Sequence, residues 1–266
     1  LDRDVNAYLT SWRLTGPAYE EHNPPTLSQL LSHTAGIGYE RIIGYRKGLP
    51  LPTLLQILEG RPPAQNQPVR IEKAPGTSFT YANSAFLVIQ LAIEETLEQT
   101  YPHAMRELVL GPLDMDESRF AHPLPEELHP RAACGHDPEG KMVEGGWRNV
   151  PELGATGLWT TPGNIARYVI EIMNAASGRE SVVLNEASAR DMLTPRMEHM
   201  GLSVFIYGEG EALQIQHGGA AVGYRNMFIA YPSKGFGAVV MTNGDQGYDL
   251  INEIMETLSR EYGWPE

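Results

Sequence analysis

The stretch PGTSFTYANSAF, residues 75–86, brings a phenol at Tyr81 and a carboxamide at Asn83 to the start of a predicted helix. The helix is indicated over residues 83–98, where apolar residues are dense enough for most of its circumference to be buried. Asn is a favoured helix cap, and an aromatic residue before a cap often packs as a hydrophobic staple. Local structure alone therefore explains Tyr81 and Asn83, and a functional interpretation needs a second element.

The second element is the motif His217-Gly218-Gly219-Ala220, which follows a predicted strand. Two successive glycines allow the backbone to approach another group very closely. The sequence leaves two explanations open, a β-bulge or a ligand site. In the second, the Ala220 amide points at a developing negative charge while Gly218 and Gly219 keep the surface flat for a substrate.

Helix and hairpin signals place these two motifs in different parts of the chain. Capping boxes at Thr26 and Thr53 each begin a short predicted helix, and Gly36 and Gly60 are expected to end them. The same signals predict helices over residues 104–110, 162–176, 186–193 and 249–262, and β-hairpins over residues 201–217 and 226–243. The pattern predicts an α+β fold that divides into residues 1–19, a mainly helical region over 20–180, and an antiparallel sheet with a C-terminal helix over 181–266.

Composition excludes several classes of protein. The formal charge is −13 over 266 residues, and no basic stripe is interleaved with aromatic residues, which argues against a nucleic-acid or anionic-membrane partner. No apolar run approaches the roughly 18 residues that a membrane span requires, so no span is predicted. Cys134 is the single cysteine, which rules out an internal disulfide.

Five segments of the chain resemble the serine β-lactamase-related hydrolases, in the branch of class C β-lactamases, DD-peptidases and family VIII esterases. They have the order and about the spacing of that family: LLSHTAGIG (30–38), PGTSFTYANSAF (75–86), GPLDMDESRF (111–120), ELGATGLWTTPGNIARY (152–168) and HGGAAVGYRNMFIAYP (217–232). They are spread along the chain from residue 30 to residue 232. The resemblance implies a β-lactamase/transpeptidase-like fold, with an antiparallel sheet flanked by helices, an all-helical region, and a cleft between them.

The family works with three motifs: Ser-x-x-Lys at a helix start, Tyr-x-Asn, and a Lys-Thr-Gly that esterase-like members often replace with His-Gly-Gly. Residues 81–83 match the second motif and residues 217–219 the third. By resemblance, Tyr81 works with the motif lysine as the proton shuttle, Asn83 contacts the substrate's carbonyl or holds the lysine, and the Ala220 amide is half of the oxyanion hole. A phenol with a pKa of about 10 is a poor base at neutral pH, so this chemistry requires a neighbouring ammonium.

The Ser-x-x-Lys motif is absent from this sequence. None of the four lysines, Lys47, Lys73, Lys141 and Lys234, has a serine three residues before it. The opening residues LDRDVNAYL match a segment that in the family follows the nucleophile helix. We therefore expect the N-terminal strands and that helix to lie outside this chain, either upstream or on another polypeptide, and the chain alone to be inactive.

The resemblance implies acyl transfer from an ester, amide or peptide to serine, followed by hydrolysis, with no cofactor. His217 in place of lysine argues against a dedicated β-lactamase, because a mostly neutral histidine binds a carboxylate less well than a fixed ammonium does. The expected partners are a small-molecule or peptide substrate and an N-terminal fragment that carries Ser-x-x-Lys. A catalytically inactive binding or scaffold paralogue is the alternative, and the compartment stays open.

No serine of this chain is expected to replace the missing nucleophile. Ser32 and His33 are neighbours on a predicted helix, where successive side chains point about 100° apart, so they are expected to serve as core or cap residues. Ser84 is expected to begin a helix. No Gly-x-Ser-x-Gly motif occurs, which argues against an α/β-hydrolase.

A metal site is not expected either. His122, His129 and His136 recur every seven residues with Cys134 nearby, but no compact ligand spacing accompanies them. Trp147 and Trp159 suit either a cleft or the core, and their size favours the core.

Overall fold

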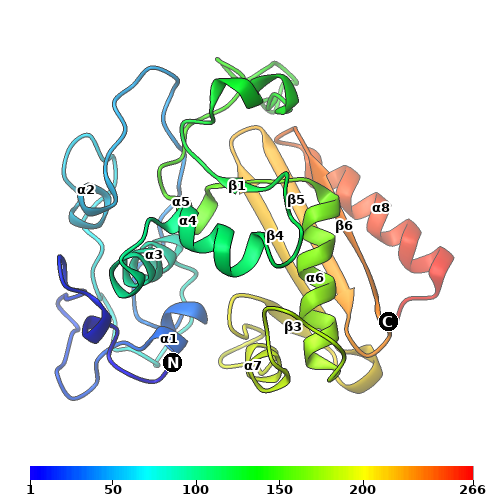
Figure 1. Cartoon of the computed structure of the whole chain (residues 1–266), viewed down its shortest axis with the longest axis horizontal. Coiled ribbons are helices and arrows are strands. Elements are labelled where there is room, and N and C mark those ends of the chain that lie inside the picture. Colours follow the sequence, from blue (N-terminus) through cyan, green and yellow to red (C-terminus); the bar gives the residue numbers. More distant parts are fainter. Residues whose placement is uncertain (266) are drawn as a thin grey trace.

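The computed structural model describes residues 1–265 and contains a mainly helical N-terminal part beside a sheet sandwiched by helices (Figure 1). The helices are α1 (Leu27–Leu31), α2 (Leu54–Glu59), α3 (Asn83–Leu97), α4 (Tyr101–Met105), α5 (Leu153–Thr156), α6 (Pro162–Ala176), α7 (Glu186–Met192) and α8 (Gly247–Tyr262). The strands are β1 (Arg119–Phe120), β2 (Leu158–Trp159), β3 (Phe205–Tyr207), β4 (Gln214–Ala221), β5 (Tyr224–Tyr231) and β6 (Phe236–Thr242). Shorter turns of 3-10 or π-helix are η1 (Val5–Tyr8), η2 (Arg106–Leu110), η3 (Glu126–Arg131) and η4 (Gly210–Ala212). No helix within residues 1–265 is long and apolar enough to cross a membrane.

The main sheet is antiparallel in the order β3-β4-β5-β6, with α6 on one face and α8 on the other (Figure 1). Alternate side chains of β5 serve the two faces, as the two-residue period of a strand dictates. Phe228 and Ala230 pack with Ile172 of α6, whereas Met227 and Ile229 join the cluster around α8. The predicted α+β class with an antiparallel sheet is confirmed, and the division into residues 1–19, 20–180 and 181–266 stays a prediction.

The N-terminal part has its own core, formed by η1 and the helices α1, α2 and α3. Both predicted capping boxes are present: Thr26 and Thr53 accept hydrogen bonds from the backbone of the third helical residue, whose side chain caps in return. Gly60 ends α2 in the left-handed conformation, as predicted (φ 62°). These local signals position the N-terminal helices around the buried face of α3.

The predicted end of α1 is wrong. The helix ends at Leu31 with Ser32 as its C-cap, and the next residue, His33, has a left-handed backbone (φ 57°). Gly36 lies beyond the helix with φ 79°, where a Cβ atom would come within 1.9 Å of the Lys73 carbonyl oxygen. Gly36 is therefore required by a close approach between two loops and not by a helix end.

Both predicted hairpins are confirmed as β3–β4 and β5–β6, and the structure adds a third between β4 and β5. Its two-residue turn is Val222-Gly223, and Ala221 pairs with Tyr224. The β3 strand pairs only with residues 214–216 of β4. The following residues of β4 therefore have no strand on that side, which leaves the backbone beyond His217 open at one edge.

Candidate active site

Asn83 does not cap α3, contrary to the local explanation from sequence. The N-cap is Ala82, and Asn83 is the first helical residue. The Asn83 carboxamide Nδ2 instead donates to the backbone oxygen of Glu40 at 3.0 Å. The carboxamide therefore ties the start of α3 to the loop over residues 39–45.

Tyr81 lies between two imidazoles. Its ring stacks on His33 with a centroid distance of 4.1 Å, and its hydroxyl is 3.4 Å from Nε2 of His217. Burial raises the pKa of Tyr81, with smaller contributions from Tyr248 and Tyr39. Burial also lowers the pKa of His217, so the pair is uncharged near neutral pH.

All six predicted site residues line one cavity of about 340 Å³: Tyr81, Asn83, His217, Gly218, Gly219 and Ala220. Tyr39, Arg41 and Tyr248 contribute to its rim. The cavity therefore lies where the start of α3 meets the open end of β4. The catalytic roles of the six residues stay predictions.

The two glycines belong to a regular strand, so the β-bulge explanation is wrong. Residues 215–221 of β4 pair one for one with β5. A Cβ atom on Gly219 would come within 2.5 Å of the Asn226 side chain on β5, and one on Gly218 would lie 3.2 Å from the Tyr248 hydroxyl. The space that the two glycines leave free is therefore occupied by the side chains of Asn226 and Tyr248.

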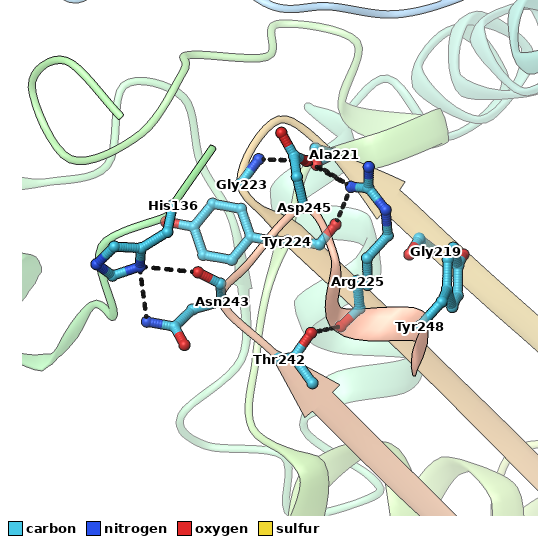
Figure 2. A network of polar contacts seen from close by, with 10 residues as sticks. All are labelled: His136, Gly219, Ala221, Gly223, Tyr224, Arg225, Thr242, Asn243, Asp245 and Tyr248. Atoms are coloured by element: carbon cyan, nitrogen blue, oxygen red, sulfur yellow. Dashed lines mark hydrogen bonds and ion pairs between the residues drawn. The ribbon is translucent and has the colours of Figure 1, made fainter. Parts of the chain in front are cut away.

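A polar network fixes the end of β4, and Figure 2 shows its members. Arg225 pairs with Asp245 at 2.8 Å and donates to the carbonyl oxygen of Ala221 at 2.7 Å. Asp245 also accepts the Gly223 N–H at 3.0 Å, and the Tyr248 hydroxyl donates to the Gly219 carbonyl at 3.1 Å. The carbonyls on either side of Ala220 are thus both held by side chains from outside β4.

The electrostatics of the cavity are unlike those of the whole chain. The lining residues include Arg41 and Arg225 and no acidic residue, although the formal net charge is −13. Arg225 is neutralised by Asp245. Arg41 lines the cavity and has no ion-pair partner among residues 1–265.

Comparison with known protein families identifies this arrangement. Residues 1–254 match the protein family described as Beta-lactamase. The chain belongs to the beta-lactamase family. The predicted resemblance to the serine β-lactamase-related hydrolases is confirmed at the level of family and fold.

Members of the beta-lactamase family and similar structures extend beyond this chain. The D-alanyl-D-alanine-carboxypeptidase/endopeptidase AmpH of Escherichia coli strain K12 is 23% identical over 282 residues, covering 96% of this chain and 70% of AmpH. The octameric penicillin-binding protein homologue from Pyrococcus abyssi has a TM-score of 0.74 at 22% identity, and the alignment covers 99% of this chain but 60% of that one. The D-stereospecific amidohydrolase from Streptomyces sp. has a TM-score of 0.70 at 18% identity, covering 92% and 75%. These similarities establish the beta-lactamase/transpeptidase-like fold.

Sequence analysis missed the residues that support the beta-lactamase-family motifs. His33, Glu40, Asp245 and Tyr248 reach the site from loops and helices distant in sequence from both motifs. Arg225 lies in the same quoted stretch as His217, residues 217–232, but its partner Asp245 follows twenty residues later. No spacing signal marks such contacts.

Ser32, His33 and Ser84 all have structural roles. The Ser32 hydroxyl donates to the Ser28 carbonyl and lies 3.0 Å from the Thr34 hydroxyl, and His33 accepts the Ala82 N–H. Ser84 is buried in the first turn of α3. The roles predicted for these residues in the core and at helix ends are confirmed by those contacts.

The histidines of residues 122–136 are dispersed. His129 lies 3.0 Å from the Leu124 carbonyl, His136 lies 2.9 Å from the Asn243 carbonyl, and His122 packs against Trp159. Within residues 1–265 no group of three or more His, Cys, Asp or Glu side chains is placed to share a metal ion. Trp147 is buried as predicted, whereas Trp159 is half-buried and lines a pocket.

Proposed function

We propose that this chain is the larger part of a serine hydrolase that cleaves an ester, amide or small-peptide bond through an acyl-enzyme. The supporting observation is that Tyr81 of one region and the Gly218–Ala220 backbone of the other line a single cavity. A proton shuttle and an oxyanion donor must face the same reacting carbon, and these two groups come from segments more than a hundred residues apart.

The hairpin geometry favours Ala220 as an oxyanion donor. Ala221 and Tyr224 close the two-residue turn, and in an antiparallel ladder hydrogen-bonded pairs alternate with unbonded pairs. With Ala221 and Tyr224 hydrogen-bonded, the Ala220 N–H points away from β5, toward the edge that β3 leaves uncovered. The exposed position of Ala220 agrees with this direction.

Tyr81 needs a cation before it can act as a base. Burial raises the pKa of its phenol, and its two imidazole neighbours are neutral because burial lowers their pKa values. A lysine ammonium near the hydroxyl would favour the phenolate. We propose that this lysine, and the serine three residues before it, come from polypeptide outside the present sequence.

A further cavity beside β4 supports the proposal that a segment from elsewhere completes the site. A second cavity of about 390 Å³ lies between α5, α6 and the α6-facing side of the sheet, and its walls include residues 153–158 and 217–221. It is therefore adjacent to the same stretch of β4 that lines the candidate site. We propose that side chains of the segment that carries Ser-x-x-Lys enter this space next to Ala220.

Acylation of the intact protein tests the proposal. The protein from the complete reading frame is treated with a fluorophosphonate and with a penicillin, and the adduct is located by mass spectrometry. We expect one labelled serine, in a Ser-x-x-Lys sequence upstream of Leu1. Tyr81→Phe should slow labelling by about 10²–10⁴-fold, the usual contribution of a general base, whereas the exposed Tyr262→Phe should label normally.

The opposite result would identify an inactive paralogue. If the reading frame encodes no Ser-x-x-Lys and neither probe modifies a serine, the protein binds ligands in its cavity without catalysis.

A further inference from the structure

A further pocket, distinct from the two cavities described above, lies beside the candidate site. Its volume is about 470 Å³, and it shares Ile42, Thr156 and residues 220–222 with the cavity around Tyr81. The shared residues include the proposed oxyanion donor. A substrate whose reacting carbonyl lies at Ala220 is therefore next to this pocket.

Part of the pocket wall is aromatic. The rings of Trp147 and Trp159 meet edge to face with centroids 5.4 Å apart, and Trp159 meets Tyr224 in the same way at 6.3 Å. Ile43 and Val150 add apolar surface. A cavity of about 150 Å³ already holds benzene, so this pocket has room for a ring together with several further heavy atoms.

Perpendicular aromatic side chains favour another ring as occupant. Aromatic rings prefer edge-to-face and offset-stacked geometries. Because Trp159 is nearly perpendicular to both Trp147 and Tyr224, a bound ring can adopt either geometry with them. Apolar contact alone would accept an aliphatic chain as well. The aromatic geometry is what makes a ring the best fit.

Polar atoms in the wall are incompletely paired. The indole Nε1 of Trp159 and Nδ1 of His122 are buried and have no hydrogen-bond partner among residues 1–265. Unpaired buried polar atoms are uncommon and often mark a missing water or ligand. Burial lowers the pKa of His122 to about 4, so this imidazole adds no positive charge at neutral pH.

The charges that line the pocket are positive. Arg131 and Arg148 belong to the lining, which includes no acidic residue. Arg131 pairs with Glu117, whereas Arg148 has no ion pair within residues 1–265. A cationic ligand would find no acidic side chain in this pocket and would be repelled by Arg148.

From these observations we infer that the pocket is a specificity subsite that takes an uncharged or anionic aromatic group of the substrate. The inference rests on the proposed function, because it places the reacting carbonyl at Ala220. It narrows the substrate class to esters, amides or peptides that carry an aromatic ring next to the cleaved bond.

Equilibrium binding tests the subsite without any need for catalysis. The probes are both enantiomers of N-acetyl-phenylalaninamide, N-acetyl-alaninamide, and the phenylalanine probe with a 4-aminomethyl group on its ring. Binding to this chain is followed by tryptophan fluorescence excited where phenylalanine does not absorb, and by ligand-observed NMR. We expect at least one phenylalanine enantiomer to bind at least tenfold more tightly than the alanine and aminomethyl probes.

Two variants locate the bound ring. Ala133 is exposed and lines the pocket, so Ala133→Trp should fill it and remove the tenfold preference. Ile43→Ser removes apolar wall at a half-exposed position and should weaken the preference. The matched control Ala187→Trp adds the same side chain at an exposed position of α7 and should leave binding unchanged.

Three results would overturn the subsite. They are equal affinity for the phenylalanine and alanine probes, a preference that survives Ala133→Trp, and no binding by any aromatic probe. Loss of the preference in a protein that is still acylated would refute only the subsite, whereas a preference without acylation of the intact protein would refute only the hydrolase.

Discussion

At the scale of single residues, the two buried titratable groups nearest the candidate site have pKa values shifted in opposite directions. His33 is buried behind Tyr81, and its Nδ1 accepts the Ala82 N–H at 3.0 Å. Its proton must therefore reside on Nε2 in the neutral ring. Glu152 is buried at the start of α5, and one of its carboxylate oxygens has no hydrogen-bond partner among residues 1–265.

His33 should make the fold less stable in mild acid. Burial, assisted by His217, lowers its pKa from 6.5 to about 4, so the unfolded chain takes up the proton first. Its contribution to the free energy of unfolding is complete above pH 6.5 and is lost as the pH falls toward 4, by about 3 kcal/mol. Urea unfolding from pH 4 to 7 should show this slope in the native chain and a flatter one in His33→Gln.

The exposed His22→Gln is the matched control and should keep the native slope. An NMR titration that placed the His33 pKa near its ordinary value would contradict the expectation.

Glu152 should make the fold less stable as the pH rises, the opposite of the effect of His33. Burial raises its pKa from 4.5 to about 7, with a smaller contribution from Glu40. The protonated carboxyl stabilises the fold fully below pH 4.5, and this contribution, about 3 kcal/mol, is lost as the pH rises through 7. Glu152→Gln should therefore gain stability relative to the native chain between pH 5 and 8, measured by urea unfolding, whereas the exposed Glu180→Gln should not. Parallel curves for native chain and Glu152→Gln would show that Glu152 stays ionised.

At the scale of elements, the β4–β5 hairpin depends on α8 for its position. The Tyr248 hydroxyl at the start of α8 donates to the Gly219 carbonyl, and Arg225 packs over the Tyr248 ring with its guanidinium carbon 5.8 Å from the centroid. The first turn of α8 therefore supports the backbone that is proposed to bind the oxyanion.

Tyr248→Phe should loosen this backbone while the fold persists. The lost hydrogen bond is worth about 1 kcal/mol, and the ring remains to pack against Arg225. Hydrogen exchange should become faster at the Gly219 and Ala221 amides, which face β5, and remain unchanged in β6. Tyr262→Phe, at the other end of the same helix, is the control. Unchanged exchange at Gly219 and Ala221 would show that the Arg225–Asp245 pair holds the strand alone.

Local signals predicted the elements far better than they predicted the site's supports. Thr26 and Thr53 begin helices through bonds to residues three positions away, so the sequence contains both partners in one window. Asn83 fits the same kind of window as a cap, yet its carboxamide bonds to Glu40, more than forty residues earlier. Tertiary contacts of this kind override local preference, and a single sequence has no signal for them.

At the scale of the molecule, β6 forms one edge of the main sheet. Among residues 1–265 no strand pairs with its outer side. Its sequence, FGAVVMT, contains neither charge nor proline. Proteins usually protect edge strands with such residues, because an uncovered apolar edge pairs readily with other chains.

The isolated chain should therefore associate through β6. Sedimentation should show a mass that increases with protein concentration, and Met241→Lys should reduce the association by placing a charge on the edge strand. In the dilute monomer, alternate amides of residues 236–242 should exchange rapidly, because every second N–H points away from β5. A concentration-independent monomer with all β6 amides protected would mean that the edge is already covered.

The ion pair between Arg225 and Asp245 has a further consequence for how the protein responds to its medium. Their side chains are only 17% and 15% exposed, unlike most other ion pairs of the described chain, whose partners face solvent. Dissolved ions screen exposed charges over about 8 Å at physiological strength but penetrate poorly to shielded ones. The conformation of the turn between β4 and β5 should therefore stay the same from low to high salt concentration, even where salt weakens the exposed ion pairs around it.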